Sequence, residues 1–269
     1  LQRAVTGYTP FYVTAANFSN GLTVTQDMGP LGLAGVLSGT NGLDIASNGV
    51  AYLTGTNTYT GATTISQKGW MGIGGPGSIA QSSSVRVDGI LDIVRSTSGQ
   101  SIRSLTGNGQ VVLGDNTLVL SQASGTFSGS LQNFYAEGTQ LPDAVPFPFL
   151  VLYTTHIPPE QVSKPHGGLI IASGQETLTG TSEYTGKTGI GQAGELILTG
   201  RLEKTQVENA GHFENNGVTT GAVESTGLVT GTGQFAGGLS VNSGYVSPGH
   251  ANSVTPDTMT VDADFSHFV

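Results

Sequence analysis

Cysteine is absent from this chain of 269 residues, and positive charge is scarce. Without cysteine the chain can form neither disulfides nor thiolate metal sites. Nine Lys and Arg stand against 18 Asp and Glu, which gives a net charge of −9, and no basic cluster occurs. Because nucleic acids and anionic membrane surfaces bind concentrated positive charge, we expect neither as a partner.

Long apolar runs and helical patterns are missing as well. No run approaches the 18 or so apolar residues of a membrane-spanning helix. The first residues, LQRAVTGYTP, lack the charged and apolar regions of a signal peptide. We therefore expect a mature protein or a fragment of one, and the absence of cysteine favours a protein that stays unfolded during export.

Gly, Thr, Ser, Asn and Gln fill the chain in short alternating segments. In SVRVDGILDIV, Val85 and Val87 lie to one side of Arg86, and the alternation resumes after Asp88 and Gly89. GQVVLGDNTLVL and GELILTG follow the same rule. A period of two predicts β-strands, and the spacing leaves no room for helical crossovers. The sequence therefore predicts an all-β fold with almost no helix.

An internal repeat favours a parallel solenoid over an antiparallel sandwich or barrel. Residues 42–65 align with residues 168–190, with a one-residue adjustment before the shared Leu-Thr-Gly-Thr. Self-similar blocks are typical of a solenoid, in which each turn packs on the next. The matched positions include Leu43/Leu169, Ala46/Ala172, Ser47/Ser173, Tyr59/Tyr184 and Gly61/Gly186. We expect both copies to form the same pair of coils, with corners at Gly55, Gly61, Gly180 and Gly186, Ile65 and Ile190 in the core, and Thr on the outer face.

After residue 200 an apolar residue recurs every five to seven positions, a rhythm that suits three short strands per coil. The recurring residues are Leu202, Val207, Phe213, Val218, Val223, Leu228 and Phe235. Asn tolerates the left-handed conformation, so we expect Asn209, Asn215, Asn216 and Asn242 at the corners.

Three phrases in order, GTNTYTGATTI, SLTGNGQVVLGDNTLVLSQASGTFSGSL and GGLSVNSGYVSPGHANSVTPDTMTVD, resemble the passenger of a bacterial autotransporter. The first two are similar to its associated β-strand repeat. The resemblance implies a right-handed, single-stranded parallel β-helix that is exported through an outer-membrane translocator barrel and stays extracellular or on the cell surface. The third phrase resembles the autochaperone segment, whose turn would fall at Val246, Pro248 and Gly249.

One stretch interrupts the pattern. Residues 131–168 hold six of the chain's 11 prolines, and proline cannot donate to a β-ladder. This stretch also holds Phe134, Tyr135, Phe147, Phe149 and Tyr153. We expect a loop or small subdomain that leaves the helix, either as a binding surface or as a hairpin packed on its side. The organisation is then rungs over 1–131, an insertion over 132–167, rungs over 168–231 and an autochaperone-like segment over 232–269.

Motifs for chemistry are weak. The serines read as strand and turn residues, GIGGPG (residues 72–77) reads as a wide corner, and Trp70 with Met71 reads as a plug at a corner. The histidines, at positions 156, 166, 212, 250 and 267, have no triad or metal spacing. We expect no catalysis, cofactor or metal in this chain.

The sequence favours a β-helical stalk and adhesin, whose partner is a host-cell or matrix protein, a glycan or another copy. The alternative is the non-catalytic C-terminal part of a subtilisin-like serine protease autotransporter. A Gly-Thr-Ser loop upstream of residue 1 would favour that alternative.

Overall fold

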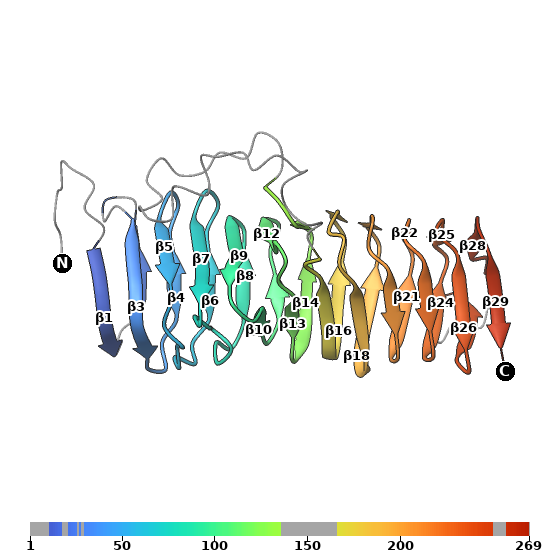
Figure 1. Ribbon diagram of the computed structural model, residues 1–269, viewed down its shortest axis with the longest axis horizontal. Coiled ribbons are helices and arrows are strands. Elements are labelled where there is room, and N and C mark those ends of the chain that lie inside the picture. The colour runs from blue at the N-terminus through green and yellow to red at the C-terminus, as the bar shows by residue number, and fades with distance from the viewer. Residues whose placement is uncertain are drawn as a thin grey trace.

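The computed structural model describes residues 11–17, 21–25, 27, 30–135, 166–249 and 257–268, and this part of the chain contains no α-helix. Short parallel strands stack into a solenoid of about ten turns (Figure 1). The arrangement confirms the predicted all-β solenoid and is consistent with a right-handed β-helix. No helix of the described residues is long and apolar enough to cross a membrane.

The strands form four sheets that run along the solenoid (Figure 1). The seven-stranded sheet contains β1 (Phe11–Asn17), β3 (Leu31–Ser38), β5 (Val50–Leu53), β7 (Trp70–Gly75), β9 (Ile90–Ser96), β12 (Gln110–Val112) and β15 (Ser130–Gln132). One five-stranded sheet contains β11 (Leu105–Thr106), β8 (Val85–Val87), β6 (Thr63–Ile65), β4 (Leu43–Ile45) and β2 (Leu22–Val24). The other contains β17 (Thr181–Ser182), β19 (Arg201–Leu202), β22 (Val218–Thr219), β25 (Gln234–Phe235) and β28 (Thr260–Val261).

The twelve-stranded sheet extends from Gln100 to Phe268. Its main path is β10 (Gln100–Ile102), β13 (Leu118–Leu120), β16 (Leu169–Leu178), β18 (Thr188–Leu198), β20 (Val207–Asn209), β23 (Val223–Ser225), β26 (Leu239–Asn242) and β29 (Phe265–Phe268). Beside this path lie β14 (Ala123–Phe127), β21 (His212–Asn215), β24 (Leu228–Gly231) and β27 (Tyr245–Pro248). Leu43 pairs with Thr63 in an early turn, Val207 with Val223 in a later one and Leu239 with Phe265 in the last, so the length of the turns varies along the chain.

The core is a continuous column of inward-facing side chains. Val85 and Val87 are buried on either side of the exposed Arg86, and Ile65 and Ile190 are buried, as the alternation predicts. Val218 and Leu228 differ from the predicted rhythm, because both are only half-buried and Val229 occupies the core position next to Leu228.

The repeated Tyr-Thr-Gly phrase builds a buried chain of hydroxyl groups. Tyr59 Oη lies 2.6 Å from Thr63 Oγ1, which lies 2.9 Å from Ser82 Oγ in the next turn, and Ser82 donates to the Gly61 carbonyl. Burial raises the pKa of Tyr59, so the phenol stays protonated as a donor. The prediction that the Thr residues of the repeat lie on the outer face is therefore wrong for Thr63. Its side chain points inward, where its hydroxyl partners lie.

The second copy repeats this chain at Tyr184, Thr188 and Thr205, with distances of 2.6 and 3.0 Å. The two copies share their local structure but not their sheet. Thr63 lies in β6 of a five-stranded sheet, whereas Thr188 lies in β18 of the twelve-stranded sheet.

A column of glycines sets the distance between turns. A Cβ built on each glycine after the first would fall within 1.9 to 2.4 Å of the carbonyl oxygen of the glycine one turn before, far closer than atoms can approach. The column consists of Gly69, Gly89, Gly109, Gly129, Gly180, Gly200, Gly217 and Gly233. Only glycine permits this approach, so any side chain here would force neighbouring turns apart.

The glycine column continues across the insertion. Gly180 stacks on Gly129, and Leu118, which precedes the insertion, pairs directly with Leu169, which follows it. Gln132 still belongs to β15, and Gly167 donates to the Gly114 carbonyl at 3.1 Å, so both expected ends of the insertion remain part of the solenoid. The rest of the predicted insertion, residues 136–165, lies outside the described residues.

One carboxyl group lies in the core. Glu176 in β16 is fully buried, and no described group makes a hydrogen bond of ordinary geometry with either side-chain oxygen. Burial raises its pKa from 4.5 to about 8, and the backbone groups of Gly125 and Leu105 offset only part of this effect. The carboxyl group is therefore largely protonated in the folded protein at neutral pH.

This burial predicts a loss of stability with rising pH. Between about pH 4.5 and 8 the unfolded chain releases the Glu176 proton while the folded chain keeps it, so the free energy of unfolding falls. Over this range the free energy of unfolding should fall by roughly 3–5 kcal/mol more in the wild type than in Glu176→Gln, as measured by urea unfolding. The exposed Glu224→Gln is the control. Equal pH slopes for wild type and Glu176→Gln would contradict the assignment.

Candidate functional site

An aromatic patch lies on the outer face of β5 and β7, separate from the core. Its apolar members are Val50, Tyr52 and Trp70, packed against Ile90 of β9. The rings of Tyr52 and Trp70 stack with centroids 6.4 Å apart and planes 10° from parallel. Trp70 is fully buried although it points away from the core, where the next residue, Met71, lies. We call these four residues, with Asp92, Arg95 and Tyr135, the Trp70 patch.

Two glycines make room for the rings. A Cβ on Gly74 would lie 1.6 Å from Tyr52 Oη, and a Cβ on Gly72 would lie 2.3 Å from the Trp70 ring. GIGGPG is therefore not a wide corner, because its first four residues lie in β7. The missing side chains of Gly72 and Gly74 allow two large rings to lie flat on the sheet. Trp70 is correspondingly part of this outer patch rather than a plug at a corner.

Polar groups connect the patch to the root of the insertion. Trp70 Nε1 donates to Tyr135 Oη at 3.2 Å, and Tyr135 Oη donates to Asp92 Oδ2. Asp92 Oδ1 accepts from the Val94 backbone at 2.8 Å. Burial raises the pKa of Tyr52 to about 12, an effect that Arg95 opposes and Asp92 increases. Tyr135, the last described residue before the gap, is thus anchored to the outer face of β7 and β9.

Asn133 holds the two ends of the insertion together. Its Nδ2 donates to the carbonyl oxygens of Gly114 at 2.8 Å and Gly167 at 3.1 Å. Its Oδ1 accepts from the Thr185 backbone at 2.8 Å. The side chain is buried. Its hydrogen bonds join residues before and after the insertion to the turns on either side.

Two of the five predicted contact residues, Phe134 and Tyr135, lie in the described part of the chain. Phe134 is 48% exposed and available to a partner, whereas Tyr135 is half-buried in the Trp70 patch. Phe147, Phe149 and Tyr153 lie outside the described residues.

Two of the three residues predicted to form the turn of the autochaperone-like segment lie in a strand. Val246 and Pro248 belong to strand β27, which pairs in parallel with β24. Gly249 has a φ of +105° and exchanges two backbone hydrogen bonds with Gly231, at 2.6 and 2.9 Å. Of the three predicted turn residues, Gly249 alone has a left-handed backbone φ.

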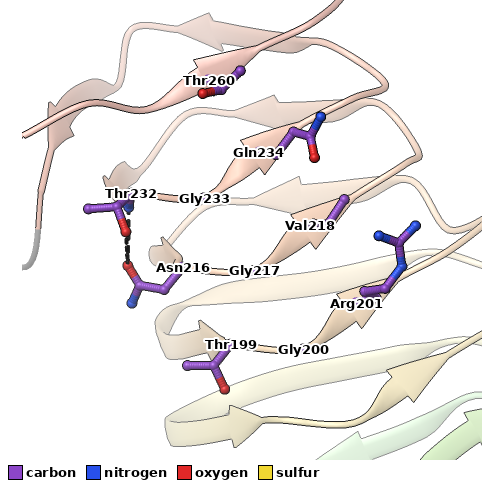
Figure 2. Close-up of a pocket in the computed structure, with 10 residues that line it drawn as sticks. All are labelled: Thr199, Gly200, Arg201, Asn216, Gly217, Val218, Thr232, Gly233, Gln234 and Thr260. Atoms are coloured by element: carbon purple, nitrogen blue, oxygen red, sulfur yellow. Dashed lines mark hydrogen bonds between the residues drawn. The ribbon is translucent and has the colours of Figure 1, made fainter.

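An open groove of about 550 Å³ follows the glycine column near the C-terminal end (Figure 2). Gly200, Gly217 and Gly233 lie along it, and Arg201, Val218, Gln234 and Thr260 are register partners on successive strands. Its single charged group, Arg201, pairs with Glu203 at 3.0 Å. The groove follows from the absence of side chains on the glycines, and its polar groups do not converge on one point.

The structure brings one histidine into a cluster that sequence spacing did not reveal. Glu195 of β18 and His212 and Glu214 of β21 place three ligand atoms within 4.8 Å of one another. A sequence signal for this cluster exists, because AGELILTG, AGHFENNG and TGLVTGTG are successive similar segments. Aligning them places Glu195 beside His212, since each follows an Ala-Gly dipeptide, and the two residues are register partners.

The same histidine forms a hydroxyl–imidazole–carboxylate array. Thr230 Oγ1 lies 2.8 Å from His212 Nε2, and His212 Nδ1 lies 2.9 Å from Glu195 Oε1. These are the distances of a catalytic triad, but Thr230 is only 3% exposed. A nucleophile must reach its substrate, so this array does not support acyl transfer.

No protein family model, curated protein or solved structure matches this chain. The resemblance to autotransporter passengers therefore depends on the sequence phrases alone.

The Trp70 patch predicts the effect of Tyr135→Phe. Removing the hydroxyl leaves Trp70 Nε1 and Asp92 without this partner, which should lower the free energy of unfolding by about 1–3 kcal/mol. Because Trp70 is the single tryptophan, its fluorescence emission should shift as well. Tyr245→Phe, at a side chain 76% exposed, should change neither quantity. Unchanged emission and stability in Tyr135→Phe would contradict the anchoring role.

Proposed function

We propose that this chain is a passenger segment of a bacterial autotransporter, secreted or displayed on the cell surface. It acts as a β-helical stalk that presents residues 136–165 as an adhesive contact surface. The ordered phrases that resemble the family and the stacked solenoid support the proposal. A solenoid suits a stalk because each turn contacts only its neighbours, so length is added without a larger core.

The observation that carries the proposal is the way in which the insertion joins the solenoid. Gly129 and Gly180 stack as closely as the other pairs in the glycine column, although the whole insertion separates them in the sequence. Asn133 and Tyr135 then secure the root to the turns beside it. A long segment on a rigid, uninterrupted support is the usual arrangement of a binding loop.

The chemistry of the chain limits the partner. With a net charge of −9, a polyanion such as heparin is disfavoured, and a host-cell or matrix protein, a neutral glycan or a second copy remains. The translocator barrel of the same precursor would be a further contact during export.

We further propose that this segment is not itself an enzyme. Burial of the Thr230 hydroxyl in the Glu195–His212–Thr230 array supports this view. In the subtilisin-like alternative the catalytic residues would lie upstream, and the stalk would serve the same purpose.

The test is binding of two purified proteins to cells, matrix proteins, glycans and the chain itself. One is the intact chain, and in the other a short Gly-Ser linker replaces residues 136–165 between Tyr135 and His166. Because Asn133 already joins the ends, the solenoid should fold in both, which circular dichroism checks. We expect the intact chain alone to bind.

The matched control keeps residues 136–165 in scrambled order, so length and composition stay constant. It should fold and fail to bind. Binding that survives both changes would place the contact surface elsewhere, and absence of binding by the intact chain would contradict the adhesive role.

A further inference from the structure

The outer face of the twelve-stranded sheet carries a cluster of nitrogen and oxygen ligands. Glu195, His212 and Glu214 point away from the core, because Leu196 and Phe213 beside them are buried in it. The three ligand atoms lie within 4.8 Å of one another, a separation that a single metal ion can span.

The backbone fixes these positions. Glu195 and His212 are direct register partners on the parallel strands β18 and β21. His212 and Glu214 are two residues apart on β21, so they share its outer face. Adjacent strands lie about 4.8 Å apart, and alternate residues about 6.6 Å apart. The ligands therefore come from a rigid surface rather than from loops, which keeps the cost of ordering them low.

A second layer of polar groups orients each ligand. Gln175 Nε2 donates to Glu195 Oε2, and Asn216 Nδ2 donates to Glu214 Oε1, both at 2.8 Å. Thr230 Oγ1 lies 2.8 Å from His212 Nε2. If Thr230 accepts from Nε2–H, the imidazole presents its Nδ1 lone pair on the side of Glu195, the tautomer that a metal ligand needs.

Charge also favours a cation here. Two carboxylates share the cluster, and Glu214 is only 8% exposed. A divalent cation would offset the repulsion between the two carboxylates and replace the contact of 2.9 Å between His212 Nδ1 and Glu195 Oε1.

We propose that Glu195, His212 and Glu214 bind a divalent transition metal, with Zn²⁺ as the representative ion. One imidazole and two carboxylates suit Zn²⁺ and its neighbours better than Ca²⁺ or Mg²⁺, which take oxygen ligands and several more of them. The side chains of His212 and Glu195 remain 19% and 27% exposed, so the outer side of the ion is open to water or to a group from a partner. None of its three residues belongs to the insertion.

The test uses the chain without a histidine tag and titrates it with ZnCl₂ by calorimetry, with CaCl₂ and MgCl₂ in parallel. We expect one Zn²⁺ per chain and a rise in melting temperature with Zn²⁺ concentration. His212→Gln and Glu214→Gln should each weaken Zn²⁺ binding at least about tenfold, and the absorption of bound Co²⁺ should be lost in both. Ca²⁺ and Mg²⁺ should bind much more weakly.

Two controls resemble the ligands chemically but lie elsewhere. Glu224→Gln changes an exposed glutamate of β23, and His267→Gln changes an exposed histidine of β29. Both should bind Zn²⁺ as the wild type does. The proposal is overturned if the wild type does not bind Zn²⁺, if either ligand variant binds it unchanged, or if Ca²⁺ binds as tightly. Glu214→Gln keeps the test valid should His212→Gln fail to fold.

Discussion

Successive turns of the solenoid approach so closely along the glycine column that no side chain fits between them. Each glycine of the column lies over the carbonyl group of the glycine one turn before. The residue that follows the glycine then donates a hydrogen bond to that carbonyl group: Ile90 N to Gly69 at 2.9 Å, and Gln110 N to Gly89 at 2.8 Å. The corner is thereby fixed, and with it the register of every strand that follows. Core alternation and the buried Tyr–Thr chains both depend on that register.

A fixed register also creates the surface. Side chains on the outer face fall into straight rows from strand to strand, so a residue type at one position meets the equivalent position of the next turn. The Trp70 patch arises where Gly72 and Gly74 leave space on such a face for Tyr52 and Trp70. The Glu195–His212–Glu214 cluster arises because Glu195 and His212 are register partners on neighbouring strands and Glu214 is the next residue on the same face of β21. Both groups of side chains therefore lie on the outer faces of the sheets.

The sequence predicts the strands and the core well, because alternation of apolar and polar residues reflects the backbone geometry directly. Ile65 and Ile190 are buried as expected. It predicts Thr63 wrongly, because threonine suits either face of a sheet and only the nearby Tyr59 and Ser82 hydroxyls draw it inward. The proximity of Glu195 and His212 depends on turn length, which varies along the chain, so residue spacing alone does not reveal it.

The measurement that tests the account most directly compares urea unfolding of Gly180→Ala and Gly189→Ala. A Cβ on Gly180 would lie 2.1 Å from the Gly129 carbonyl oxygen, across the joint that closes the insertion, whereas one on Gly189 would lie 3.4 Å from a flexible Ile170 side chain. We expect Gly180→Ala to lower the free energy of unfolding by at least about 2 kcal/mol, and Gly189→Ala to change it by less than about 1 kcal/mol. Equal stability of the two variants would contradict the claim that the glycine column holds the solenoid in register.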